Sequence, residues 1–93
     1  MELSEKDLHT QALYELIANI TDPKDVEALL EDLCTRKEVE NMAERVYAAQ
    51  LLMDGNTYNQ VMSQASISSA TLSRVSRCVQ YGRGYSRLLK KNE

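Results

Sequence analysis

The side chains best suited to chemistry lie between positions 57 and 77, where hydroxyl groups and arginines recur at helical spacing. Arg74 and Arg77 stand three residues apart, which places both guanidinium groups on one face of a helix. A guanidinium can contact a phosphate or grip a guanine edge, and hydroxyl and N–H groups at a helix start can hold a phosphate. The pattern therefore predicts a set of side chains that contact DNA. Its members are Thr57, Ser68, Ser69, Ala70, Ser73, Arg74 and Arg77.

Two short helices and a tight turn are expected to position these side chains. The run "TYNQ" is a capping box, in which Thr57 and Gln60 satisfy each other's backbone N–H groups at the start of a helix. Ser68 is the N-cap of a second helix, and Ser66 and Ile67 lie in the connection. Two short helices joined in this way are typical of a helix-turn-helix, which we place at residues 56–80. A C-terminal helix is expected at residues 83–91.

Charge divides the chain into an acidic and a basic half. Residues 1–56 carry five Lys or Arg and thirteen Asp or Glu, whereas residues 57–93 carry six Lys or Arg and Glu93 as the one acid. This asymmetry favours a polyanion as the partner of the second half alone. Chance segregation of charge in a small domain is the alternative. Two interpretations are also open for the cationic residues near the C-terminus, which either contact phosphates or form a solvated face. These residues are Arg83, Arg87, Lys90 and Lys91.

Residues 1–55 are expected to form three helices with one apolar face each. Ser4 and Asp22 are N-cap candidates for the first two, and Pro23 suits a first helical position. A capping box at Thr35 opens a long third helix, which Gly55 ends. The apolar surface exceeds what 93 residues can cover internally, so we expect an intertwined homodimer with residues 1–55 as its dimerisation part. The predicted class is all-α, with one domain over residues 1–93.

Several other functions find little support in the residues. No window approaches the roughly 18 apolar residues of a membrane span, and the polar N-terminus is unlike a signal peptide, so we expect a cytoplasmic protein without membrane contact. Cys34 and Cys78 are expected to be reduced and packed. His9 is the single histidine and has no ligand-spaced neighbours, so we expect neither a metal site nor a catalytic residue. The sequence thus argues against an enzyme.

The run "TYNQVMSQASISSATLSRV" resembles the helix-turn-helix of bacterial repressors, which commonly reads T-x-x-x-V-A-x-x-A-G-V-S and then x-x-T-V-S-R-V. Met62 and Ser66 depart from it, since alanine and glycine are usual there. Met62 implies a wider helix crossing, and Ser66 implies either a strained turn or a longer connection. With the preceding segment, residues 29–81 resemble the Trp-repressor-like family, specifically its YerC/YecD-type branch. That resemblance implies a dimer presenting two reading heads to successive major grooves, roughly 34 Å apart.

The resemblance also bears on a small-molecule site. By position, Thr35, Arg45 and Arg74 match the threonine and two arginines of the family's tryptophan pocket, and Cys78 stands where tryptophan binders have serine. Val75 stands where they have glycine beside the indole, and overpacking of this kind costs about 1–3 kcal/mol. We therefore expect no required cofactor, with tryptophan or another ligand as the alternative. Without a ligand, we expect Arg45 to pair with an acid, either Glu40 or Asp32.

These features together predict a sequence-specific, dimeric regulator of transcription that binds double-stranded DNA and acts as a repressor. The competing hypothesis is a helical dimerisation or adaptor module that recruits a protein partner. Acidic residues on the exposed face of the second short helix would favour the adaptor, and residues 56–91 contain none.

Overall fold

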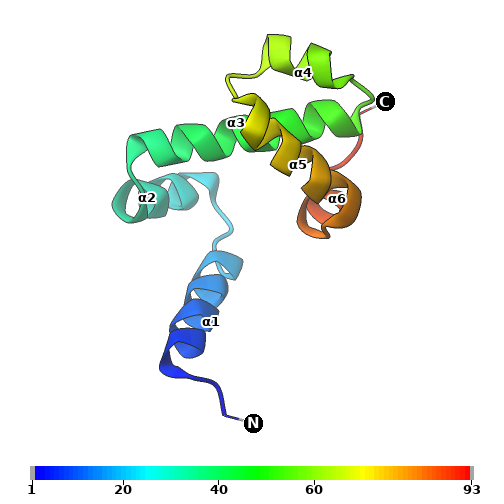
Figure 1. Cartoon of the computed structure of the whole chain (residues 1–93). Coiled ribbons are helices and arrows are strands. Elements are labelled where there is room, and N and C mark those ends of the chain that lie inside the picture. Colours follow the sequence, from blue (N-terminus) through cyan, green and yellow to red (C-terminus); the bar gives the residue numbers. More distant parts are fainter. Residues whose placement is uncertain (1, 93) are drawn as a thin grey trace. The chain divides into compact units, whose positions relative to one another are not determined.

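The computed structural model describes residues 2–92, and among these residues it contains helices and no strand (Figure 1). The predicted all-α class is therefore confirmed. Two compact units follow one another along the chain, one ending at Thr35 and the other beginning at Arg36. No helix within residues 2–92 is both long and apolar enough to cross a lipid bilayer.

The first unit contains α1 (Glu5–Ala18) and α2 (Pro23–Leu33). Each helix begins at its predicted N-cap: the Ser4 hydroxyl accepts from the Asp7 N–H at 3.2 Å, and the Asp22 carboxylate accepts from the Lys24 N–H at 2.9 Å. Neither helix buries any residue. Apolar side chains on α1 are about half exposed, among them Leu8, Leu16 and Ile17.

The second unit contains the long helix α3 (Arg36–Met53), followed by α4 (Tyr58–Gln64), α5 (Ser69–Tyr81) and α6 (Gly84–Leu88). α5 crosses α3, and both α4 and α6 pack against α5 (Figure 1). α3 contributes two alanines, Ala48 and Ala49, and with no side chain beyond Cβ they let α4 and α5 pack close to it. The buried core consists of Ala48, Ala49, Val61, Ala65, Leu72 and Val75.

The end of α3 follows the prediction made from Gly55. Gly55 adopts a φ of +97°, a region that side chains with a Cβ rarely enter. The Asn56 N–H donates to Leu51 O at 3.0 Å and the Gly55 N–H to Leu52 O at 3.1 Å. These two bonds are those of a Schellman motif, which satisfies the last carbonyls of the helix and redirects the chain into α4.

The C-terminal helix is shorter than predicted, because α6 ends at Leu88 rather than continuing to Lys91. The following residues bond to side chains near the end of α3. Gln50 Nε2 donates to Lys90 O at 2.7 Å, and the Asp54 carboxylate accepts from the Asn92 backbone N–H at 2.7 Å and from Asn92 Nδ2 at 3.1 Å. These tertiary hydrogen bonds take the place of another helical turn.

Acid should release this C-terminal segment. The hydrogen bond from the Asn92 N–H, helped by those from the Gln50 and Asn92 side chains, holds the pKa of Asp54 below its ordinary 3.8. A lowered pKa means that the stabilisation is fully present above pH 3.8 and is lost as the pH falls through the folded-state value. In an NMR titration, the Asn92 amide should therefore shift with a midpoint below 3.8. An unchanged midpoint in Asp54→Asn would contradict this assignment.

Candidate nucleic-acid interface

α4 and α5 begin with the two caps that the sequence predicted. The Gln60 N–H donates to the Thr57 hydroxyl at 3.2 Å while the Thr57 N–H donates to Gln60 Oε1 at 2.7 Å, which completes the capping box. The Thr71 N–H donates to the Ser68 hydroxyl at 3.2 Å. The Ser68 hydroxyl donates its own proton to Thr71 Oγ1 at 3.0 Å, whereas the Thr57 hydroxyl proton stays available to an acceptor.

The turn between α4 and α5 is not strained. No residue other than glycine has a positive φ in the described part of the chain, so the strained backbone considered for Ser66 is wrong. The Ser66 N–H instead donates to Glu44 Oε1 on α3 at 2.7 Å. The Ile67 N–H donates to Ala65 O at 3.1 Å, and the Ile67 side chain packs against the core. Serine is accommodated where repressors commonly have glycine because the turn requires no positive φ at this position.

α5 presents the DNA-contacting residues on one side and buries the other side. Leu72 and Val75 are buried against α3 and α4. At about 100° per residue, the remaining candidates on α5 span an arc of about 140° on the opposite face. They are exposed: Ser69, Ala70, Ser73, Arg74 and Arg77. Tertiary packing therefore brings these predicted residues together on one accessible surface.

Electrostatics on this surface favour an anion. Residues 56–92 contain no acidic side chain. Within the described chain, the ion pair that forms joins Arg36 to Glu40, at 3.3 Å, and neither Arg74 nor Arg77 is paired with a carboxylate. Both arginines lie in the middle part of α5, and their exposed guanidinium groups keep hydrogen-bond donors available to a partner.

One contact at this surface escaped the sequence analysis. The Tyr58 hydroxyl donates to Ser69 O at 2.8 Å. The bond joins the first residue of α4 to the first residue of α5. The only signal for it in the sequence is the residue type, since a tyrosine that packs its ring usually finds a partner for its hydroxyl.

The residues predicted for a ligand pocket do not all come together. Arg45 and Arg74 line a polar cavity of about 610 Å³ beside the turn, together with Glu44 and Ser66. Thr35 belongs to the first unit. Arg45 does not pair with Glu40 as expected: its Nε donates to Asn41 O at 3.3 Å, and Glu40 bonds to Arg36 instead.

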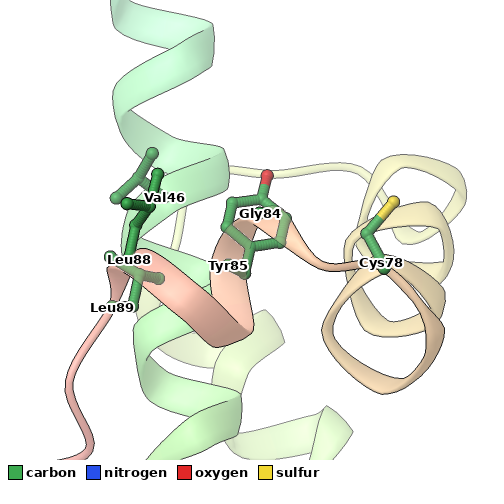
Figure 2. Close-up of a pocket in the computed structure, with 7 residues that line it drawn as sticks. Val46, Cys78, Gly84, Tyr85, Leu88 and Leu89 are labelled. Atoms are coloured by element: carbon green, nitrogen blue, oxygen red, sulfur yellow. The ribbon is translucent and has the colours of Figure 1, made fainter.

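Cys78 lines a different, mostly apolar cavity of about 440 Å³ (Figure 2). Val46 from α3 and Tyr85, Leu88 and Leu89 from the C-terminal end of the chain form its other walls. Cys78 and Cys34 are both unpaired thiols and half-buried. Val75 lines neither cavity, because its side chain is 2% exposed and packs within the core.

A metal site would require several ligating side chains close together. Within residues 2–92, no group of three or more His, Cys, Asp or Glu side chains is arranged to hold a metal ion. His9 lies exposed on α1.

Comparison with known proteins supports the resemblance and extends it. The family model for the Trp repressor protein matches residues 8–93. The uncharacterized protein YerC of Bacillus subtilis (strain 168) is 37% identical over 70 residues, which cover 75% of this chain and 67% of that protein.

Two solved structures have the same fold. A crystal structure of a candidate Trp repressor from Staphylococcus aureus superposes with a TM-score of 0.84 at 25% identity, covering 98% of this chain and all of that one. A TrpR-like protein from Eubacterium eligens ATCC 27750 superposes with a TM-score of 0.81 at 30% identity, covering 87% of this chain and 84% of that one. The family is one of DNA-binding regulators rather than enzymes. From its helices, its matched span and its relatives, the chain belongs to the Trp repressor protein family.

Proposed function

We propose that the protein is a sequence-specific, dimeric DNA-binding transcription regulator that acts as a repressor and requires no small-molecule corepressor. The observation that carries the proposal is the outer face of α5. That face is exposed and free of acids, while the other side of the same helix packs on α3 and α4. A helix held in this way can enter a major groove with its N-terminal side chains toward the bases.

The side chains divide by the contacts they suit. Ser69, Ala70 and Ser73 are small enough for close approach to base edges, and Arg77 can reach a guanine or a phosphate. Arg74, which borders the polar cavity, suits a phosphate. Thr57 keeps a hydroxyl proton for a phosphate oxygen, and Ser68 acts mainly through its cap.

Dimerisation is supported by apolar surface that the chain leaves uncovered. α1 and α2 bury none of their own residues, and the cavity around Cys78 is almost entirely apolar. Exposed apolar area of this extent is typical of an interface. A two-fold symmetric pair would cover the same patch on both copies and carry two reading heads.

Independence from a corepressor is supported by Val75. Its side chain already fills space in the core beside Leu72, and a ligand plane at that position would have to displace it. Repacking of that kind costs about 1–3 kcal/mol. The binding of tryptophan or another small molecule beside Arg45 and Arg74 is the competing possibility.

Selection of bound duplexes from a random library, run with and without tryptophan, tests the proposal. We expect one palindromic motif in both arms, with half-sites about 10 base pairs apart, since two heads on one dimer read successive major grooves. Enrichment in the tryptophan arm alone would refute independence from a corepressor. No enrichment by a folded dimer at moderate salt would favour the adaptor alternative, in which exposed apolar side chains such as Leu16 bind another protein.

A further inference from the structure

We propose that Glu44 is a positioning residue for α5, the recognition helix. Its carboxylate clamps the α4–α5 turn to α3, so that the chain itself holds the reading head, which consists of α4, the turn and α5, in place. This inference rests on the proposed function and concerns how that function is regulated. The clamp is a charge-assisted hydrogen bond of 2.7 Å from the Ser66 N–H to Glu44 Oε1. Bonds to an ionised acceptor are shorter and stronger than those between neutral groups.

The neighbouring residues of the turn provide no acceptor for the Ser66 N–H. The Ala65 N–H closes the last turn of α4 on Val61 O at 2.9 Å, and the Ile67 N–H bonds back to Ala65 O. The Ser66 N–H lies between these two bonds and receives its partner from a residue 22 positions earlier in the chain. The acceptor of this exposed N–H is thus a side chain of α3 rather than a group of the turn itself.

The position of the turn makes the bond consequential. Ser66 is followed by Ile67, which packs on the core, and by Ser68, the N-cap of α5. The first exposed residue of the recognition face, Ser69, comes next. The turn is therefore attached to α3 by one polar contact and to the core by one apolar contact, immediately before the DNA-contacting residues of α5 begin. If the turn and α5 are already ordered in the free protein, no conformational entropy has to be lost to order them when they bind DNA.

A bound small molecule could in principle provide the same attachment, because Glu44 and Ser66 line the cavity that also contains Arg45 and Arg74. The Glu44 carboxylate, at the wall of that cavity, already makes this attachment through the Ser66 N–H. The turn and α5 should thus be held in the position that reads DNA in the free protein, which gives a structural cause for the proposed independence from a corepressor.

The direction in which a substitution of Glu44 changes the affinity for DNA distinguishes this role from a simple electrostatic effect. Glu44 is an acid close to a surface that is proposed to meet DNA, and removal of an acid should by itself strengthen binding to a polyanion. Loss of a clamp should weaken binding instead. Glu44→Ala should bind DNA roughly tenfold more weakly, with an unchanged dependence on salt concentration, because no phosphate contact is lost.

The experiment uses the full chain and the duplex that the unaltered protein selects from a random library. Glu44→Gln keeps an oxygen acceptor and should restore most of the affinity. Glu40→Ala is the matched control: it removes an acid one turn earlier on α3 that bonds to Arg36 rather than to the turn, and it should bind as tightly as the unaltered chain or more tightly. Alanine is the best helix former and Glu44 is only half-buried, so α3 should persist.

Amide hydrogen exchange without DNA provides an independent readout. In Glu44→Ala the Ser66 amide should exchange about tenfold faster or more, while amides in the middle of α3 keep their protection. Unchanged exchange at Ser66, or DNA binding by Glu44→Ala at least as tight as that of the unaltered chain, would overturn the clamp. Failure of the unaltered chain to bind any duplex would instead overturn the proposed function, so the two failures are distinguishable.

Discussion

The Arg77→Ala variant is expected to bind its selected duplex roughly a hundredfold more weakly than the unaltered protein. Arg77 is exposed on the outer face of α5 and has no carboxylate partner within residues 2–92, so its donors are available to DNA. A good arginine contact to a base is worth about 1–3 kcal/mol, and the proposed dimer would lose two of them. Fluorescence anisotropy with a labelled duplex at several salt concentrations measures the effect.

The salt dependence shows which contact Arg77 makes. If it binds phosphate, the slope of log affinity against log salt should fall by about two for the dimer, and all sequences should weaken alike. If it binds a base edge, the slope should stay nearly constant while discrimination at that base pair declines. Arg36→Ala is the control, because Arg36 is exposed on α3 and bonds to Glu40. Equal affinity and equal slope for Arg77→Ala and the unaltered chain would show that Arg77 has no such role.

Replacement of Leu72 by alanine is expected to lower the free energy of unfolding by about 2–5 kcal/mol. Leu72 is fully buried and packs among Ala48, Ala49 and Val61, where α5 meets α3 and α4. Truncation removes buried apolar surface and leaves a cavity that the surrounding helices can only partly close. In a domain of this size, the loss corresponds to a fall in Tm of roughly 10 °C or more.

Thermal unfolding followed by circular dichroism, at one protein concentration for all variants, measures this loss. Concentration must be held constant because the proposed dimerisation would contribute to apparent stability. Ser73→Ala lies next along α5 but on the exposed face, so it should change the stability by no more than about 0.5 kcal/mol. Equal melting of Leu72→Ala and Ser73→Ala would contradict the core assigned to α5.

The sequence by itself determined where four of the helices begin, namely α1, α2, α4 and α5. Caps at Ser4, Asp22, Thr57 and Ser68 were readable because each acceptor bonds to an N–H two or three residues along the same chain. The left-handed stop at Gly55 was readable for a similar reason, since only the residue's own backbone freedom decides it. The exposed side of α5 followed from the helical spacing of Arg74 and Arg77.

Only the tertiary structure decided which distant groups meet. The Glu44 carboxylate receives the Ser66 N–H, Asp54 receives Asn92, and Tyr58 reaches Ser69, across separations of 22, 38 and 11 residues. Spacing along a chain gives no information on such pairs, because they depend on how α3, α4, α5 and the C-terminal segment cross in space. The same dependence shortened α6 and separated Cys78 from Arg45 and Arg74. Local hydrogen bonding therefore made the elements of this protein predictable, whereas packing between elements decided the turn, the tail and the cavities.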